Sequence, residues 1–265
     1  MPKSICILAK ETLAEEYSVI GLSDHDIASR HRTSARTVCR LRSLYSIQTD
    51  KRYQLRRNPL RHEVLSNKQL EFLYGSLLGD SCIGRHKSGT GYWICTHAAR
   101  QEQYLRSKAN IMRPFTAKIW TGSRPFKEGG PLFPYVRART YALPQFTALR
   151  QELYPGGKKT MTEEWFRKIT PAGFAFWFLD DGSSTGYGFD ITTFDEFFKD
   201  IDRTVDLFRT VLDLDVSVHW HGKEGRIHVL RSSHDKAWEY VRSEMTSDMW
   251  HKIPRRYHEH PCHQT

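Results

Sequence analysis

Length and charge bound the classes of protein that this sequence can encode. The 265 residues allow one large domain or two to three small ones, and 39% hydrophobic with 26% charged residues is typical of a soluble globular protein. Lys and Arg number 40 against 30 Asp and Glu, a formal charge of +10 that favours nucleic acid as the partner. An inert basic surface is the alternative that charge alone leaves open.

The chain lacks the features of a membrane or secreted protein. No run approaches the ~20 apolar residues that a spanning helix needs, and residues 1–17 turn acidic too early for a secretory signal. The 5 cysteines are scattered and never have CxxC spacing. We therefore expect reduced thiols and an intracellular location, whether cytoplasmic, organellar or in a phage or bacterial host cell.

Residues 1–50 predict a small all-α domain. Ser23 can cap a first helix whose leading acids favour its positive end, and Thr33-Ser34 separates it from a second helix, Ala35 to about Tyr45. Two short helices with a basic second one indicate a DNA-binding helix-turn-helix. A helical hairpin that only packs on its neighbour is the alternative. The arginines expected to point outward from the second helix are Arg36, Arg40 and Arg42.

Residues 51–65 are predicted to be a linker that follows phosphates. The segment KRYQLRRNPLR carries five basic and no acidic residues. Its candidate DNA contacts are Arg52, Arg56 and Arg57.

From residue 66 onward the predicted elements occur in the same order twice. In the first repeat we expect a helix over Gln69–Asp80, strands over Tyr92–His97, Ala117–Thr121 and Leu132–Tyr141, and helices over Arg100–Arg113 and Pro144–Tyr154. In the second repeat we expect strands over Tyr187–Thr193, Val216–Trp220 and Arg226–Arg231. We expect helices over Pro171–Asp181, capped by Thr170, and over Glu196–Leu212. A capping box at Ser232–Asp235 is predicted to open a last helix that runs to about Met245. Such a duplication implies a molecule with a pseudo-twofold axis.

The first helix of each repeat is apolar and ends in aspartate. These segments are Leu73–Ser81 and Phe174–Gly182, with Asp80 and Asp181 at the same position of each. A helix that is apolar all round is buried, and a carboxylate at its negative end is unfavourable. Because two such carboxylates also repel each other, a divalent cation such as Mg²⁺ or Mn²⁺ would relieve both penalties.

Small residues on the first helix predict a close helix contact. Gly75 and Gly79 leave one face bare, although each costs about 1 kcal/mol inside a helix. Phe176 and Asp180 stand at the matching positions of the second helix, so the contact cannot be symmetric. We expect the Phe176 ring to face the glycine notch.

The two segments resemble the paired motifs of LAGLIDADG homing endonucleases in their single-chain form. The resemblance covers about residues 66–256 and includes Lys158-Lys159-Thr160 and His251-Lys252-Ile253-Pro254. It implies a mixed α/β fold in which two pseudo-twofold-related repeats form a saddle of antiparallel DNA-binding sheets. It also implies that Asp80 and Asp181 bind Mg²⁺ or Mn²⁺, with the backbone of Gly79 and Asp180 as further ligands, and that Lys159 and Lys252 assist catalysis.

The implied activity is site-specific hydrolysis of both strands of a long DNA target by a monomer. We expect the Asp180 side chain to cap or support the site and not to bind metal. Polar and basic strand residues are the candidates for reading the DNA. They are Arg85, His86, Lys87, Arg137, Arg139, His219, His221, Lys223 and Arg226.

The domain boundaries and the alternatives follow from this assignment. We expect a helix-turn-helix over 1–50, a linker over 51–65, repeats over 66–169 and 170–256, and a tail over 257–265 whose histidines lack zinc-site spacing. A maturase that binds intron RNA, or a repressor that binds nucleic acid without cleaving it, is the alternative function. A helix-turn-helix transcription factor with an effector domain would not account for the two acidic helices.

Overall fold

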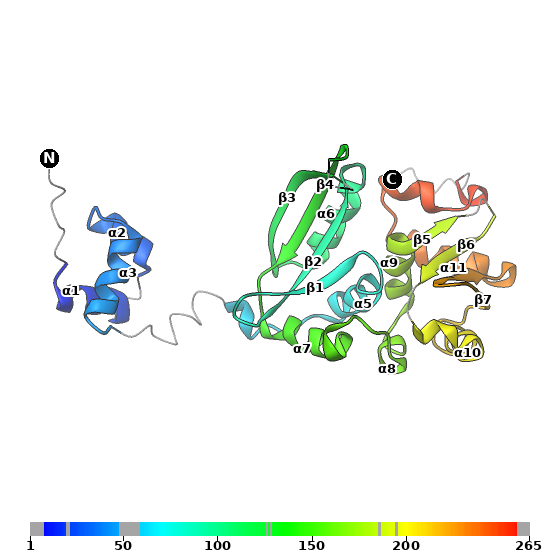
Figure 1. Cartoon of the computed structure of the whole chain (residues 1–265), viewed down its shortest axis with the longest axis horizontal. Coiled ribbons are helices and arrows are strands. Elements are labelled where there is room, and N and C mark those ends of the chain that lie inside the picture. Colours follow the sequence, from blue (N-terminus) through cyan, green and yellow to red (C-terminus); the bar gives the residue numbers. More distant parts are fainter. Residues whose placement is uncertain are drawn as a thin grey trace. The chain divides into compact units, whose positions relative to one another are not determined.

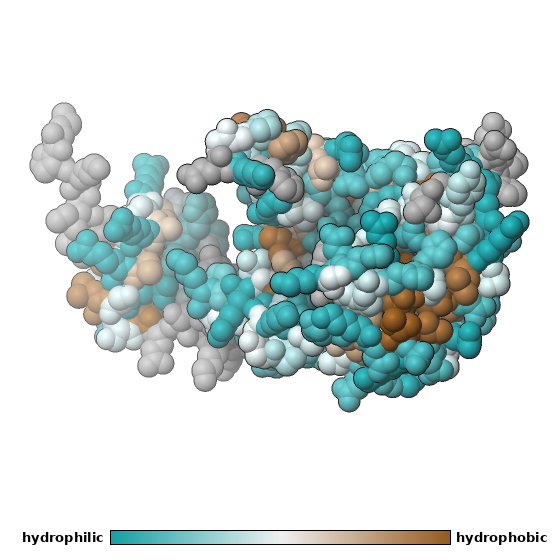
Figure 2. Space-filling view, turned by 45° about the vertical axis from the view of Figure 1, so that its right-hand side comes forward, coloured by the Kyte–Doolittle hydropathy of each residue, from teal (hydrophilic) through white to brown (hydrophobic). Residues whose placement is uncertain are grey.

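The structure is a computed structural model, and it describes residues 8–19, 22–47, 59–125, 127, 129–184, 187–193 and 196–258, without the side chains of 18 and 19. The chain divides into two compact units, Met1–Glu63 and Val64–Thr265, which are described separately. Among the helices of the described residues, none is both long and apolar enough to cross a bilayer. Hydrophilic side chains cover most of the face seen in Figure 2, with apolar side chains gathered in a few patches.

The N-terminal unit contains both predicted helices and one that the sequence did not indicate. The helices are α1 (Lys10–Ala14), which continues as a π-helical turn (Glu15–Val19), α2 (Asp24–Arg30) and α3 (Ala35–Leu44). The Ser23 hydroxyl accepts a hydrogen bond from the Asp26 amide, and the Asp26 carboxylate accepts from Ser23 in return, so the predicted start of α2 is confirmed. Leu13, Tyr17, Ile27 and Val38 form its small core.

Arg42 does not point outward as the sequence predicted. Its side chain is buried, and its guanidinium donates two hydrogen bonds to Asp24, at 2.7 and 2.8 Å. The same group lies over the Tyr17 ring, 4.1 Å from its centre. Arg42 therefore ties α3 to α2 and to the π-helical turn, and it is removed from the set of candidate DNA contacts.

The first repeat is a four-stranded antiparallel sheet with helices on one side. Its elements are α5 (Asn67–Ser76), β1 (Ser81–Arg85), β2 (Gly91–Ala98), α6 (Glu102–Ile111), β3 (Thr116–Pro125), β4 (Leu132–Thr140) and α7 (Pro144–Leu153). The strand order is β1-β2-β4-β3. Along β2 the buried residues Trp93, Cys95 and His97 alternate with half-exposed ones, because one face of the sheet packs on α6 and α7.

The second repeat has the same architecture. After a short helix, α8 (Glu163–Phe166), its elements are α9 (Pro171–Asp181), β5 (Gly182–Ser184), β6 (Phe189–Thr193), α10 (Ile201–Leu212), β7 (Val216–His221), β8 (Glu224–Val229) and α11 (His234–Arg242). The strand order, β5-β6-β8-β7, matches that of the first repeat. The predicted mixed α/β duplication is therefore confirmed, and the two sheets lie on opposite sides of the adjoining α5 and α9 (Figure 1).

Several predicted boundaries in the repeats were wrong. Strands β1 and β5 were missed because they are short and polar and follow the acidic helix ends directly. The helix predicted over Glu196–Leu212 is interrupted at Asp200, whose side chain caps α10. The Ser232–Asp235 capping box is absent, because the Ser232 hydroxyl donates to Asp215 and α11 begins at His234.

The predicted tail begins too early. Tyr257 is 5% exposed and its hydroxyl donates to Asp235 at 2.6 Å. The second repeat therefore continues at least to this residue. Residues 259–265 lie outside the described part of the chain.

The α5–α9 contact is made by backbone. A Cβ at Gly75 would collide with the carbonyl oxygen of Gly173, and one at Gly79 would collide with the side chain of Asp180. Phe176 lies at the α5–α9 contact as predicted, but its ring does not fill the glycine notch: it meets Phe72 of α5 edge-on, with ring centres 4.9 Å apart. At Gly75 the notch takes Gly173, near the start of α9, and at Gly79 it takes Asp180, near the end of α9. The second contact brings the C-terminal ends of the two helices together.

Substitution of Gly75 by alanine should separate these helices. We expect Gly75→Ala to lower the free energy of unfolding by about 2–3 kcal/mol, because the added methyl group has only backbone to displace. Thermal melting checks this, with Thr210→Ala on the exposed face of α10 as a control that should change stability by less than about 0.5 kcal/mol. An unchanged melting temperature for Gly75→Ala would contradict the close contact.

Candidate active site

Asp80 and Asp181 lie at the ends of the two central helices. Asp181 is the last residue of α9, and Asp80 follows the turn that ends α5. Burial, followed by the charge of Asp180, raises the pKa of Asp80 to about 6. Burial, followed by the charges of Asp80 and Asp180, raises the pKa of Asp181 to about 7. The structure thus brings the two predicted carboxylates close enough to repel each other.

Lys159 and Lys252 reach the same two helix ends. The Lys159 ammonium donates to the carbonyl oxygens of Leu78 and Gly79, each at 3.2 Å, and that of Lys252 donates to the carbonyl oxygen of Asp180. Helix C-termini carry partial negative charge, so a cation is favourable there. Burial lowers the pKa of both lysines, while the neighbouring aspartates act in the opposite direction.

The backbone carbonyl oxygens of Gly79 and Asp180, which were predicted as further metal ligands, already bind the two lysines. The oxygens of Gly79 and Asp180 each accept a lysine hydrogen bond, which leaves one lone pair on each. Each lysine contacts the carbonyl that directly precedes a candidate carboxylate. The two halves of the site are thus built on the same plan.

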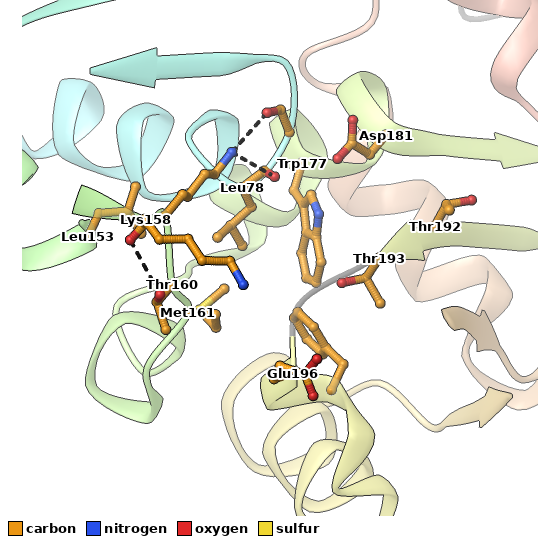
Figure 3. A pocket seen from close by; sticks show the side chains of 13 residues that line it. Leu78, Leu153, Lys158, Thr160, Met161, Trp177, Asp181, Thr192, Thr193 and Glu196 are labelled. Carbon is orange, nitrogen blue, oxygen red and sulfur yellow. Dashed lines mark hydrogen bonds between the residues drawn. The ribbon is translucent and has the colours of Figure 1, made fainter. Parts of the chain in front are cut away.

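A pocket of about 500 Å³ opens beside Asp181. Figure 3 shows the Asp181 side chain at its rim, next to Trp177 and across from Lys158, with Thr192 and Thr193 on the strand behind. The pocket combines basic and acidic groups with an apolar floor.

Asp180 is fully buried and does not face this pocket. One carboxylate oxygen accepts from the Lys108 ammonium and from the Tyr104 hydroxyl, the latter at 3.0 Å, and the other accepts from Ser76 at 2.9 Å. Burial acts to raise the pKa of Asp180, but the charge of Lys108 and the hydrogen bonds from Lys108 and Ser76 keep it below its usual value. Asp180 thus joins the second repeat to three side chains of the first.

Sequence reasoning missed Lys108, Tyr104, Ser76 and His97. A signal existed for Lys108, because it falls on the same face of α6 as the buried residues Tyr104 and Leu105. A lysine in an apolar helix face needs a buried anion. Its partner, however, lies 72 residues away, and no local pattern identifies it.

The donor set fits a divalent cation at Asp80 and Asp181. Both are hard carboxylate donors whose mutual repulsion a dication would remove. One atom each from Asp80, His97 and Asp180 also lie within 4.8 Å of one another. That second grouping does not fit a cation, because Lys108 and Tyr104 donate to one oxygen of Asp180 and Ser76 donates to the other.

The open face of the first sheet carries a basic and aromatic stripe. Arg137 and Arg139 of β4 pair with Trp120 and Lys118 of β3, respectively. The Arg137 guanidinium lies 5.7 Å from the Trp120 ring centre and 5.0 Å from that of Tyr135, and it donates to Thr96. The stripe contains two predicted residues and adds Lys118 and the rings.

The remaining candidates are distributed between strands and turns. His219 and Arg226 are paired neighbours on the exposed face of the second sheet. Three of the candidates lie at the β1–β2 connection and two at the β7–β8 turn: Arg85, His86, Lys87, His221 and Lys223. Arg36 and Arg40 are exposed on α3, whereas Arg52, Arg56 and Arg57 lie outside the described residues.

Comparison with known proteins agrees with this geometry. The model of the LAGLIDADG DNA endonuclease family matches residues 70–236. RecA of Mycobacterium shimoidei is 31% identical over 126 residues, 46% of this chain and 27% of that protein. The cytochrome b mRNA maturase bI2 of Debaryomyces hansenii is 27% identical over 137 residues, 50% of this chain and 52% of the maturase. The chain thus spans about a quarter to a half of the length of these relatives.

A solved structure shares the fold. The homing endonuclease I-WcaI bound to its DNA recognition sequence superposes with a TM-score of 0.66 at 17% identity, covering 80% of this chain and 96% of that one. Because the family model spans more than half of the sequence, the chain belongs to the LAGLIDADG DNA endonuclease family. The family resemblance predicted from Leu73–Ser81 and Phe174–Gly182 is confirmed.

The raised pKa of Asp181 predicts that the metal-free site destabilises the fold above neutral pH. Its pKa is about 7 when folded against 3.8 for the free group. Protonation therefore stabilises the fold at low pH, and this stabilisation is lost as the pH rises to 7. In EDTA, Asp181→Asn should be more stable than wild type by roughly 1–2 kcal/mol at pH 8 and by less at pH 5.

Melting curves at the two pH values measure this difference. Asp206→Asn, an exposed aspartate on α10, is the control and should show no such dependence. A wild-type protein that is more stable than Asp181→Asn at pH 8 would contradict the electrostatic description of the site.

Proposed function

We propose that this protein is a site-specific, metal-dependent DNA endonuclease that cleaves both strands of a long target. The observation that carries the proposal is the pair of mutually repelling carboxylates, Asp80 and Asp181, at adjoining helix ends with one half-buried lysine on each side. The family assignment supports the same activity. Since both motifs lie in one chain, we infer that a monomer supplies both halves of the site.

The chemistry divides between the cation and four side chains. A bound Mg²⁺ or Mn²⁺ would polarise the scissile phosphate and lower the pKa of the attacking water. Asp80 and Asp181 would hold the cation through their carboxylate oxygens. Lys159 and Lys252, anchored to helix-end carbonyls, place positive charge where the phosphate becomes more negative.

The sheets supply the surface for the duplex. Arg137, Arg139 and Lys118 neutralise phosphates or read base edges from the first sheet, and Arg226 with His219 does so from the second. Antiparallel strands are suited to the major groove.

The cysteines support an intracellular location for this activity. Among the described residues, the thiols of Cys39, Cys82 and Cys95 are free, as is typical of a protein in a reducing compartment.

A plasmid that carries the uninterrupted insertion locus of the protein's own gene tests the activity. We expect linear product with Mg²⁺ and none with EDTA. Asp80→Asn and Asp181→Asn should lower the cleavage rate by at least about 10³-fold, because each removes a metal donor. Asp206→Asn is the matched control and should cleave at the wild-type rate.

The same experiment separates the alternative function. The similarity to a cytochrome b mRNA maturase favours RNA binding as the second candidate. Intact plasmid under every metal condition, together with tight binding of intron RNA, would replace the endonuclease proposal by a maturase role.

We further infer that the N-terminal unit anchors the protein on DNA. Arg36 and Arg40 are four residues apart on α3 and are exposed together with Cys39 and Ser43, so they share one face of the helix. The capped turn before α3 and the Arg42–Asp24 pair fix this helix on its small core. A basic exposed face on a second helix is the arrangement that enters the major groove.

Removal of these two arginines should weaken DNA binding without changing the fold. For Arg36→Ala/Arg40→Ala in the full chain, we expect the slope of log K against log salt to decrease in magnitude by about 2, because two phosphate contacts are lost. Fluorescence anisotropy over a salt series measures the slope. The control Arg167→Ala/Arg203→Ala removes two exposed arginines that pair with Glu163, and it should leave the slope unchanged.

A further inference from the structure

A buried histidine lies between the active site and the buried ion pair. The His97 side chain, on β2, is 1% exposed. Its Nδ1 atom lies 3.4 Å from Asp80 Oδ2, and its Nε2 atom lies 3.1 Å from the Lys108 ammonium nitrogen. The ring thus faces a candidate metal ligand on one side and a buried cation on the other.

Lys108 determines which ring nitrogen carries the proton. Its ammonium is held charged by Asp180, to which it donates, and it has no solvent contact. An ammonium group can only donate, so Nε2 must accept. Because Nε2 then carries no proton, the ring is neutral. A neutral ring that accepts at Nε2 carries its proton on Nδ1.

That Nδ1–H group has one carboxylate to donate to. Nδ1 is buried and makes no hydrogen bond within normal limits in this structure. Asp80 Oδ2 is the carboxylate oxygen it faces. A buried N–H without a partner is unfavourable. The Gln101 side chain also lies near the ring, but Asp80 is the charged acceptor, and a small rotation of its side chain, which is 41% exposed, closes the gap.

We propose that His97 is a positioning residue that orients the Asp80 carboxylate, so that the two strand-cleaving halves of the site are not equivalent. Binding one carboxylate oxygen directs the other toward the cation, as hydrogen-bonded partners of metal ligands do. The inference rests on the proposed endonuclease function for its effect on cleavage. Which ring nitrogen of His97 carries the proton can be tested whether or not the protein cleaves DNA.

The second repeat has no such histidine. Ser81 pairs with Cys95 in the first sheet, and Gly182 pairs with Ile191 in the second. Two residues further along each strand stand His97 and Thr193. A threonine offers no ring nitrogen, so Asp181 has no corresponding imidazole donor. The same asymmetry appears at Asp180, whose counterpart in the first helix is Gly79.

His97 does not act as a metal ligand in this arrangement. A cation at Nδ1 would need that nitrogen free of its proton, which moves the proton to Nε2. The Nε2 position already faces the Lys108 ammonium, and two donors would then oppose each other. A dication there would also lie near a buried positive charge.

Nuclear magnetic resonance tests the proton position directly. Long-range ¹H–¹⁵N correlation spectra of full-length protein with ¹⁵N-labelled histidine, with the His97 signals assigned by their loss in His97→Asn, report which nitrogen is protonated. We expect a neutral ring with its proton on Nδ1. A proton on Nε2, or a doubly protonated ring, would overturn the proposal.

Strand-resolved cleavage tests the consequence. On a target duplex whose strands carry different labels, His97→Phe should slow one strand roughly tenfold while the other changes little, so that nicked product accumulates. His97→Asn keeps a hydrogen-bond donor at the Nδ1 position, so the ratio of the two strand-cleavage rates should be close to that of the wild type. The control His234→Phe removes another buried histidine, which bonds to the Val229 carbonyl, and should leave the ratio of strand rates unchanged.

The outcomes distinguish this inference from the proposed function. Equal loss on both strands in His97→Phe, or no change in their ratio, would overturn the asymmetry. If wild-type protein fails to cleave in Mg²⁺, the endonuclease proposal fails. The protonated nitrogen found by nuclear magnetic resonance then still shows whether the His97 N–H group points to Asp80.

Discussion

Two carboxylates of like charge are held together at the centre of the repeats, and the rest of the structure makes this possible. Gly75 allows α5 to lie against the backbone of Gly173, and Gly79 allows it to lie against Asp180, so that Asp80 and Asp181 stand at adjoining helix ends. Their raised pKa values express the cost of that arrangement. Lys159 and Lys252 offset part of the cost through the helix-end carbonyls, and a dication would offset the remainder.

The two repeats share one architecture, but the side chains at the contact between them differ. Asp180 crosses from the second repeat into a cavity lined by Ser76, Tyr104 and Lys108 of the first, and Gly79 leaves it room. A buried ion pair of this kind contributes little net stability, but removing one partner is costly. We infer that it fixes the register of the two repeats, because the buried Lys108 ammonium of the first repeat is paired with this carboxylate of the second.

The sequence predicted those parts of the fold that have a local signal, such as a capping residue or an apolar run. The caps at Ser23 and Thr170 and the apolar runs before Asp80 and Asp181 have local signals, and the structure contains them. The duplication followed from the repeated order of elements. Lys159 and Lys252 were identified through the family resemblance, since a single lysine has no distinguishing pattern.

What the sequence did not predict depends on contacts between distant segments. Arg42 looked exposed on a basic helix, but Asp24 and Tyr17 hold it inside. His97 lay in a predicted strand without a visible role until Lys108 and Asp80 were placed on either side of it. Strand β5 has only 3 residues, and β1 has 5 residues with a glycine and a terminal arginine among them, so neither has a strong strand signal. Both are defined by their pairing with β2 and β6.

The position of the metal ion is the most direct test of this account. Anomalous scattering from Mn²⁺ in crystals of the protein bound to its target duplex locates the ion without reference to activity. The account predicts a peak bounded by the carboxylates of Asp80 and Asp181. A peak at Asp180 and His97 instead, or carboxylates of Asp80 and Asp181 that point away from every ion, would contradict it.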